Sequence, residues 1–263
     1  MRGPTRSGSV DPYGVFEYIR RGVSCLKRNP FCRLTSILSK SIFIATISFV
    51  WLCCPAQAQT TAAEFIKHGK ELLEQKQYYE ASKMFDAAVK ADPASSEAYC
   101  YRGKLALDDA QGMADLARAI ELRPDYADAF YERGLKYDLA NNSAAALADY
   151  NKALQLNPKF VEAYRTRAVL YLLDGKGEPA IADYTKIVEL KPGGESYYMR
   201  GNSYLELGQD AKAIIDLTKS IELDPTYYWA YMQRAKAYRH LNRFKLAQAD
   251  EAKAAQIGPP KID

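Results

Sequence analysis

The chain has 263 residues, of which 48% are hydrophobic and 26% charged, a composition typical of a soluble globular protein. Its net charge of +4 is unevenly distributed, because residues 1–58 hold 8 of the 36 Lys and Arg but only 2 of the 32 Asp and Glu. The remaining 28 basic and 30 acidic residues give a net charge of −2. Such a region has no electrostatic reason to bind nucleic acid, so we exclude that class of function.

Residues 1–58 have the pattern of a secretory leader. Basic residues precede the apolar run Ile42–Cys54, and Ala56-Gln57-Ala58 follows it. A basic region, a short apolar core and an A-x-A site predict a signal peptide that is cleaved after Ala58. The alternative is a membrane anchor through residues 42–54, but this run of 13 residues is shorter than the span of about 20 that a helix needs. An organellar transit peptide is suggested by Arg and Ser before residue 40 and disfavoured by the apolar core. We therefore expect a bacterial protein that is periplasmic or secreted.

The second predicted domain, residues 59–263, consists of repeats. One column of prolines recurs at intervals of 31, 34, 34, 33 and 34 residues: Pro93, Pro124, Pro158, Pro192, Pro225 and Pro259. A second, basic column has nearly the same period: His68, Arg102, Arg133, Arg167, Arg200 and Arg234. Self-similarity at about 34 residues predicts a solenoid of small units, each of which buries its apolar side against its neighbours.

Each unit is predicted to contain two helices. In the unit of residues 127–160, Phe130, Gly134 and Tyr137 lie on one face of a first helix. Asn142 and Ser143 suit the start of a second helix, which Pro158 ends. Small residues occupy the same place in all first helices (Gly69, Gly103, Gly134, Ala168, Gly201, Ala235) and in all second helices (Ala81, Gly112, Ala146, Ala180, Ala213, Ala247). The two helices can therefore approach closely as an antiparallel pair.

The sequence resembles the tetratricopeptide repeat over six consecutive units from Ala62 onwards. The resemblance rests on the two small residues, on an aromatic residue four positions before the small residue of the first helix, and on the proline that ends the unit. The resemblance implies an all-α solenoid of six antiparallel helix pairs that forms a right-handed superhelix. The second unit, Ser96–Tyr126, is three residues short, and we expect this loss to fall in the turn between its helices. The sixth unit carries Glu251 where the others have a large apolar residue, so it is predicted to be the cap.

Five units pair an arginine of the first helix with an aspartate of the second, whereas the first unit has His68 and Met84 at these places. Because both partners are missing together, we predict a structural ladder of bidentate ion pairs. An anion-binding row of arginines is the alternative. The pattern does not say whether the pairs lie within units or between them. The predicted ladder comprises Arg102, Arg133, Arg167, Arg200 and Arg234 with Asp115, Asp149, Asp183, Asp216 and Asp250.

No motif in the sequence predicts catalysis, a metal or a cofactor. The expected mature chain keeps two distant histidines, His68 and His240, and one cysteine, Cys100, and it contains neither G-x-S-x-G nor H-E-x-x-H. We therefore predict that the protein is not an enzyme and has no catalytic residues, no metal ligands and no cofactor. Cys100 is expected to be a small packing residue.

The resemblance implies that the first helices line a concave groove for a protein or an extended peptide. Aromatic residues, Met and Arg are enriched at such interfaces. The groove residues that it implies are Cys100, Tyr101, Tyr131, Arg165, Tyr198, Met199, Asn202, Trp229, Met232 and Lys236. The carboxylate clamp of chaperone-binding members is missing, since its positions hold Ile66, Lys70, Tyr101, Asp128 and Glu132. We expect a monomeric, exported scaffold that binds a partner protein; the alternatives are a self-assembling structural protein and a small-molecule or glycan-binding module.

Overall fold

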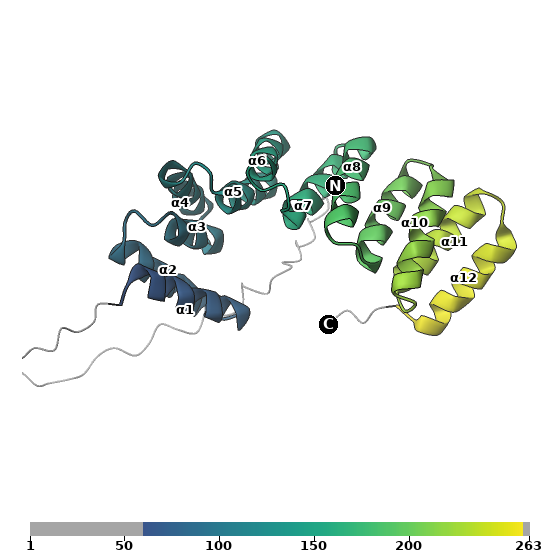
Figure 1. Ribbon diagram of the computed structural model, residues 1–263, viewed down its shortest axis with the longest axis horizontal. Helices are drawn as coiled ribbons and strands as arrows, with labels where there is room; N and C mark the ends of the chain where they lie inside the picture. The colour runs from purple at the N-terminus through teal and green to yellow at the C-terminus, as the bar shows by residue number, and fades with distance from the viewer. Residues whose placement is uncertain (1–59, 260–263) are drawn as a thin grey trace, which may run out of the picture. The chain divides into compact units, whose positions relative to one another are not determined.

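A computed structural model describes residues 60–259 of the chain, all of which belong to the compact unit Ala58–Asp263. The predicted leader, residues 1–58, lies outside the described residues. Within the described range the secondary structure is entirely helical (Figure 1). The helices are α1 (Ala62–Glu74), α2 (Tyr78–Ala91), α3 (Ser96–Leu105), α4 (Asp109–Leu122), α5 (Ala127–Leu139), α6 (Ser143–Leu156), α7 (Val161–Leu173), α8 (Gly177–Leu190), α9 (Gly194–Glu206), α10 (Asp210–Leu223), α11 (Tyr228–His240) and α12 (Phe244–Ile257).

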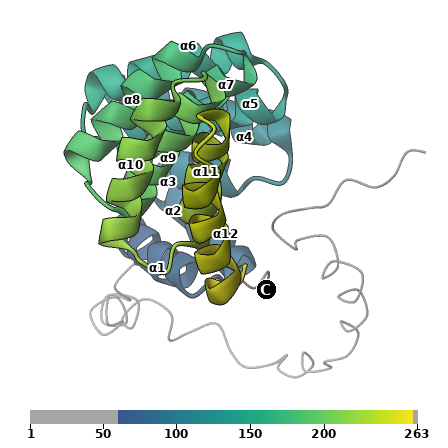
Figure 2. The ribbon, with the colours of Figure 1, turned by 90° about the vertical axis from the view of Figure 1, so that its right-hand side faces the viewer.

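Successive helices form pairs, and each pair packs on the next. Odd-numbered helices are the first helices of the units and even-numbered ones the second, and each second helix also contacts the first helix of the following unit. Figure 2 shows the last pair, α11 and α12, lying side by side nearest the viewer. The predicted all-α tetratricopeptide-type solenoid is confirmed for this part of the chain.

The turns within units explain where five first helices end. Each of these turns has three residues, and the middle one has a positive φ: Lys76, Asn141, Gly175, Gly208 and Asn242. In the unit of residues 127–160, the Asn142 side chain then accepts a hydrogen bond from the backbone N–H of Ala145 and caps α6. This cap satisfies one of the free donors at the start of the second helix.

The second unit departs from the prediction in one respect. Its turn, residues 106–108, keeps three residues, whereas α3 has 10 residues and the other first helices have 13. The expectation that the missing residues fall between the helices is therefore wrong, because the first helix gives up its last turn. The physical reason is that three residues are needed to reverse the chain and to place Asp108, whose side chain accepts from the backbone N–H of Gln111, as the cap of α4.

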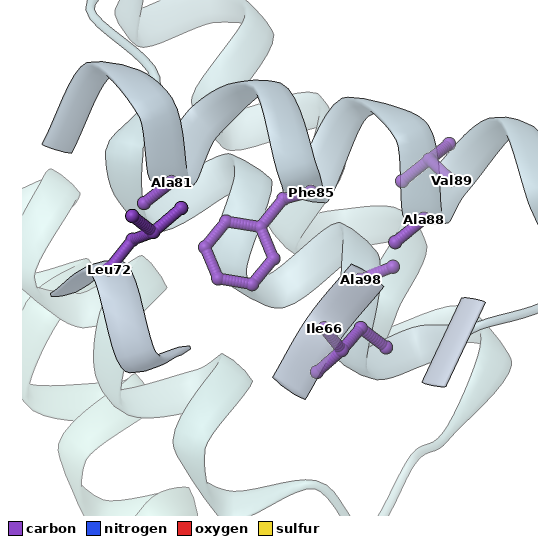
Figure 3. Packing of buried hydrophobic residues seen from close by; sticks show 7 residues of the cluster. All are labelled: Ile66, Leu72, Ala81, Phe85, Ala88, Val89 and Ala98. Carbon is purple, nitrogen blue, oxygen red and sulfur yellow. The ribbon is translucent and has the colours of Figure 1, made fainter. Parts of the chain in front are cut away.

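The core consists of large side chains of the second helices that lie against the small residues of the first. In the first unit Phe85 is fully buried among Ile66, Leu72 and Ala81 (Figure 3). A Cβ atom added to Gly69 would lie 2.6 Å from the Phe85 ring. The same place holds Leu116, Tyr150, Tyr184 and Leu217 in the next four units, and all are buried.

The arginines of the predicted ladder each donate two hydrogen bonds to the aspartate of their own unit. Nε and Nη2 approach the two carboxylate oxygens to between 2.5 and 2.8 Å in all five pairs. The aspartates are buried and the arginines are half-buried. Hydrogen bonds to their aspartates raise the pKa of Arg102, Arg133, Arg200 and Arg234. The carboxylate partner of each arginine therefore lies within the unit.

The third nitrogen of the guanidinium group, Nη1, reaches back to the preceding unit. It lies 3.6 Å from Asp86 Oδ1 in the Arg102 pair and 2.5 Å from Asn151 Oδ1 in the Arg167 pair. For Arg200 and Arg234 the acceptors are Thr185 Oγ1 at 3.5 Å and Thr218 Oγ1 at 3.0 Å. The corresponding residue of the second unit is Ala117, which has no side-chain acceptor for Arg133. Four of the five arginines thus join two units.

Candidate protein-binding site

One side of the first helices is continuous from unit to unit, and we call it the first-helix face. Side chains on this face join neighbouring first helices. The Lys70 ammonium pairs with Glu97, Lys104 Nζ lies 2.5 Å from Glu132 Oε1, the Tyr131 hydroxyl lies 3.3 Å from Thr166 Oγ1, and Arg165 Nη1 lies 2.7 Å from Glu195 Oε1. These contacts connect α1 to α3, α3 to α5, α5 to α7 and α7 to α9, so the faces of adjacent helices lie beside one another.

The three predicted groove tyrosines each pack against another aromatic ring. Tyr101 stacks on Phe85, with ring centroids 4.9 Å apart, and Tyr131 lies 4.8 Å from Phe160. Tyr198 packs edge-on against Tyr227 at 5.0 Å. All three are half-buried, and burial raises the pKa of each phenol. Only part of each ring is therefore available to a partner.

Two predicted groove residues of the last unit, Trp229 and Lys236, are exposed. Trp229, at the start of α11, is 44% exposed and packs edge-on against Tyr228. Lys236 is exposed, while Met232, Asn202 and Met199 are half-buried. Arg165, in the middle of the face, is already paired with Glu195.

Cys100 does not belong to the accessible part of this face. It is 3% exposed, and burial, followed by the charge of Glu132, raises the pKa of its thiol to about 12. The family resemblance placed Cys100 in the groove, but it lies in a buried cluster with Tyr126 of its own unit and Ala129 of the next.

Sequence reasoning missed three exposed apolar residues at the centre of the first-helix face. Leu139 on α5 and Leu173 on α7 are each 77% exposed, and Val169 on α7 is 45% exposed. Leu139 and Leu173 stand five residues after the small residue of their unit and Val169 stands one after it. The signal that could have identified the two leucines is an apolar residue at a place where the other four units carry Glu, Asp or His.

Two shallow depressions lie elsewhere. One of about 380 Å³ is lined by residues of α1 and the start of α3, including Ile66 and Lys70. The other, of about 500 Å³, is lined by α9 and α10, including Tyr197 and Ile214. Neither is formed by the predicted groove residues. Within residues 60–259, no cluster of His, Cys, Asp and Glu side chains is arranged to hold a metal ion, and no helix has the length and apolar character needed to cross a membrane.

Nested helix pairs joined by their first helices define an α-solenoid protein. Models of the tetratricopeptide repeat match residues 66–111, 127–160, 194–227 and 217–252. Because these matches together cover more than half of the sequence, the chain belongs to the tetratricopeptide-repeat family. Such repeats generally mediate protein–protein interactions, and no catalytic family is indicated. A search of curated proteins finds no match.

Solved structures show the same fold. PilW, a widely conserved type IV pilus biogenesis factor, matches with a TM-score of 0.63 at 17% identity over 74% of this chain and 92% of its own. YrrB, a tetratricopeptide-repeat protein with an unusual peptide-binding site, matches with a TM-score of 0.50 at 21% identity, over 66% of this chain and 91% of its own. A chain of the Cut9–Hcn1 hetero-tetramer of APC/C matches with a TM-score of 0.58 at 17% identity over 78% of this chain. The match spans only 42% of the length of that chain. At these identities the likeness shows the fold alone.

Proposed function

We propose that this protein is a non-enzymatic scaffold that binds a partner protein or an extended peptide along the first-helix face. The observation that carries the proposal is the character of this face. Its helices are held side by side by Lys104–Glu132, Tyr131–Thr166 and Arg165–Glu195, and large side chains such as Trp229 remain exposed on it. A face that is ordered before binding loses little conformational entropy on association, so the ordering cost falls mainly on the partner.

We also propose that the repeat domain acts outside the cytoplasm, in the periplasm or after secretion. This part of the proposal is supported by the basic residues, apolar run and A-x-A site of residues 1–58. PilW, whose fold this chain shares, is a pilus biogenesis factor. N-terminal sequencing of the protein from a fractionated bacterial host tests it. A periplasmic product that begins at Gln59 is expected, whereas an unprocessed chain in the membrane fraction would support the anchor instead.

Partner binding is tested with variants at the accessible C-terminal end of the face. Trp229→Ala and Met232→Ala are expected to lower the recovery of a partner from an envelope extract by at least about fivefold, because Trp is enriched among hot spots and Met at interfaces. Ile215→Ala, which removes an exposed apolar side chain from the second helix α10, is the matched control. Circular dichroism should show unchanged helicity in all three. Recovery at the wild-type level with both face variants would place the binding site elsewhere.

A further inference from the structure

The centre of the first-helix face combines exposed apolar side chains from two adjacent helices. We call Leu139, Val169 and Leu173 the α5–α7 patch. Val169 and Leu173 are one helical turn apart on α7. The Tyr131–Thr166 contact holds α5 beside α7 on this side of the molecule. The patch is thus an apolar surface shared by two units and accessible from one side.

Carboxylates lie on the same side of these helices as the patch, two of them at its edge and two about three helical turns away. Asp128 precedes Leu139 by 11 residues and Glu162 precedes Leu173 by 11 residues, which is about three helical turns, so each acid lies on the same side of its helix as the leucine. On the neighbouring α9, Glu206 follows Glu195, the partner of Arg165, by the same interval. Asp138 is adjacent to Leu139.

These four acids have no basic partner among the ion pairs of residues 60–259. The pairs that do form on this part of the face, Lys104–Glu132 and Arg165–Glu195, use one base for each acid. Asp128, Asp138, Glu162 and Glu206 therefore add negative charges to this side of α5, α7 and α9 that no ion pair of the described residues neutralises.

Asp138 lies at the edge of the patch and is only partly accessible to solvent. Asp138 is half-buried, and burial raises the pKa of its carboxyl group. Tyr150 is fully buried, its hydroxyl has no hydrogen-bond partner, and the charge of Asp138 contributes, after burial, to raising its pKa. The charged form of a half-buried carboxylate is stabilised when a cation approaches it.

We propose that the α5–α7 patch binds an amphipathic segment of a partner protein in which Lys or Arg residues flank the apolar side chains. The apolar residues of the segment would cover Leu139, Val169 and Leu173, and its cations would pair with Asp138 and the three other acids. The inference rests on the proposed function, since it assigns the chemistry of the partner and moves the main contact from α11 to the middle of the face. Opposite charges at the rim select the partner and steer its approach, while the apolar contact keeps it bound.

The test uses two fluorescent peptides of the same length and leucine pattern, one containing Lys and the other Glu, and measures their affinity for the repeat domain, residues 59–263. The Lys peptide is expected to bind at least about tenfold more tightly than the Glu peptide at low salt, and to lose much of this preference in high salt. Leu139→Ser and Leu173→Ser should each weaken binding of the Lys peptide by about tenfold, as expected for central interface residues. Asp138→Asn should reduce both its affinity and its salt dependence. Ile215→Ser, at an exposed apolar position on α10, is the matched control and should change nothing.

Equal binding of the two peptides, no binding of either, or wild-type affinity in both leucine variants would overturn the inference. A dimer in sedimentation velocity that Leu173→Ser dissociates would also overturn it, because a second copy would then cover the patch. Thermal unfolding of each variant ensures that a folded protein is compared. These outcomes leave the proposed function separately testable: a partner whose recovery depends on Trp229 but not on Leu173 would support the scaffold and reject the patch.

Discussion

The Arg–Asp ladder gives a quantitative test of how the units are held together, and the Arg167–Asp183 pair is the best place for it. Arg167 Nε and Nη2 donate to the two oxygens of Asp183 at 2.8 and 2.5 Å, and Nη1 donates to Asn151 Oδ1 of the preceding unit at 2.5 Å. The Asp183 side chain is 5% exposed and that of Arg167 is 17% exposed. Burial alone would lower the pKa of Arg167, but the hydrogen bonds and charge of Asp183 outweigh it and raise the pKa.

Arg167→Ala and Asp183→Ala should each lower the free energy of unfolding by about 3 kcal/mol, because removing one partner of a buried pair leaves the other charge buried without compensation. The double variant has no orphaned charge, so it should lose about 4 kcal/mol and the coupling energy should be about 2 kcal/mol. Urea denaturation followed by circular dichroism measures all four proteins of the cycle. Single losses that add up within about 0.5 kcal/mol would refute the reasoning.

An exposed pair of the same geometry provides the control for burial. Arg239 donates Nε and Nη2 to the two oxygens of Glu251 at 2.7 and 2.8 Å, but the two side chains are 52% and 34% exposed. Solvent screens this pair, so its coupling energy should be much smaller than that of the buried Arg167–Asp183 pair. Equal coupling in the exposed and buried pairs would mean that bidentate geometry, and not burial, determines the strength of the ladder.

Three further predictions follow from individual sites. Gly134→Ala should cost about 1–3 kcal/mol of unfolding free energy in urea denaturation, because its Cβ would lie 2.6 Å from the Tyr150 ring; an unchanged stability would contradict this packing. Since burial raises the pKa of Asp138, the folded protein binds its proton more tightly, and stability falls as pH rises from the unfolded to the folded pKa. Asp138→Asn should therefore stabilise the domain at neutral pH and not below the unfolded pKa, and the opposite order in thermal melts would reject the assignment. Cys100, whose pKa burial raises to about 12, should react with a thiol reagent at pH 8 only after unfolding, so rapid labelling of the native protein would exclude the buried position.

The sequence alone determined the repeats, the helix pairs and the residues of the ladder, whereas the structure showed that each arginine pairs with the aspartate of its own unit. These features depend on residues a fixed interval apart, such as Gly134 and Ala146 or Arg133 and Asp149, and units three to six keep these intervals. Helical periodicity is a local property, so it can be read without knowing how the units stack. The tetratricopeptide-type solenoid followed from it and is confirmed by the structure.

Only the tertiary structure decided which side chains remain free. Cys100 and Leu139 both lie on first helices, yet Cys100 is buried under the next unit and Leu139 is 77% exposed. The contact of Nη1 of a ladder arginine with the preceding unit likewise depends on the residue found there. Asn151 supplies an acceptor for Arg167, whereas Ala117 supplies none for Arg133. Exposure and unit-to-unit contacts are set by the neighbour that packs on a helix, and a single unit's pattern does not contain that neighbour. For this reason the repeats could be predicted residue by residue, whereas the surface that we propose for the partner could be identified only in the folded chain.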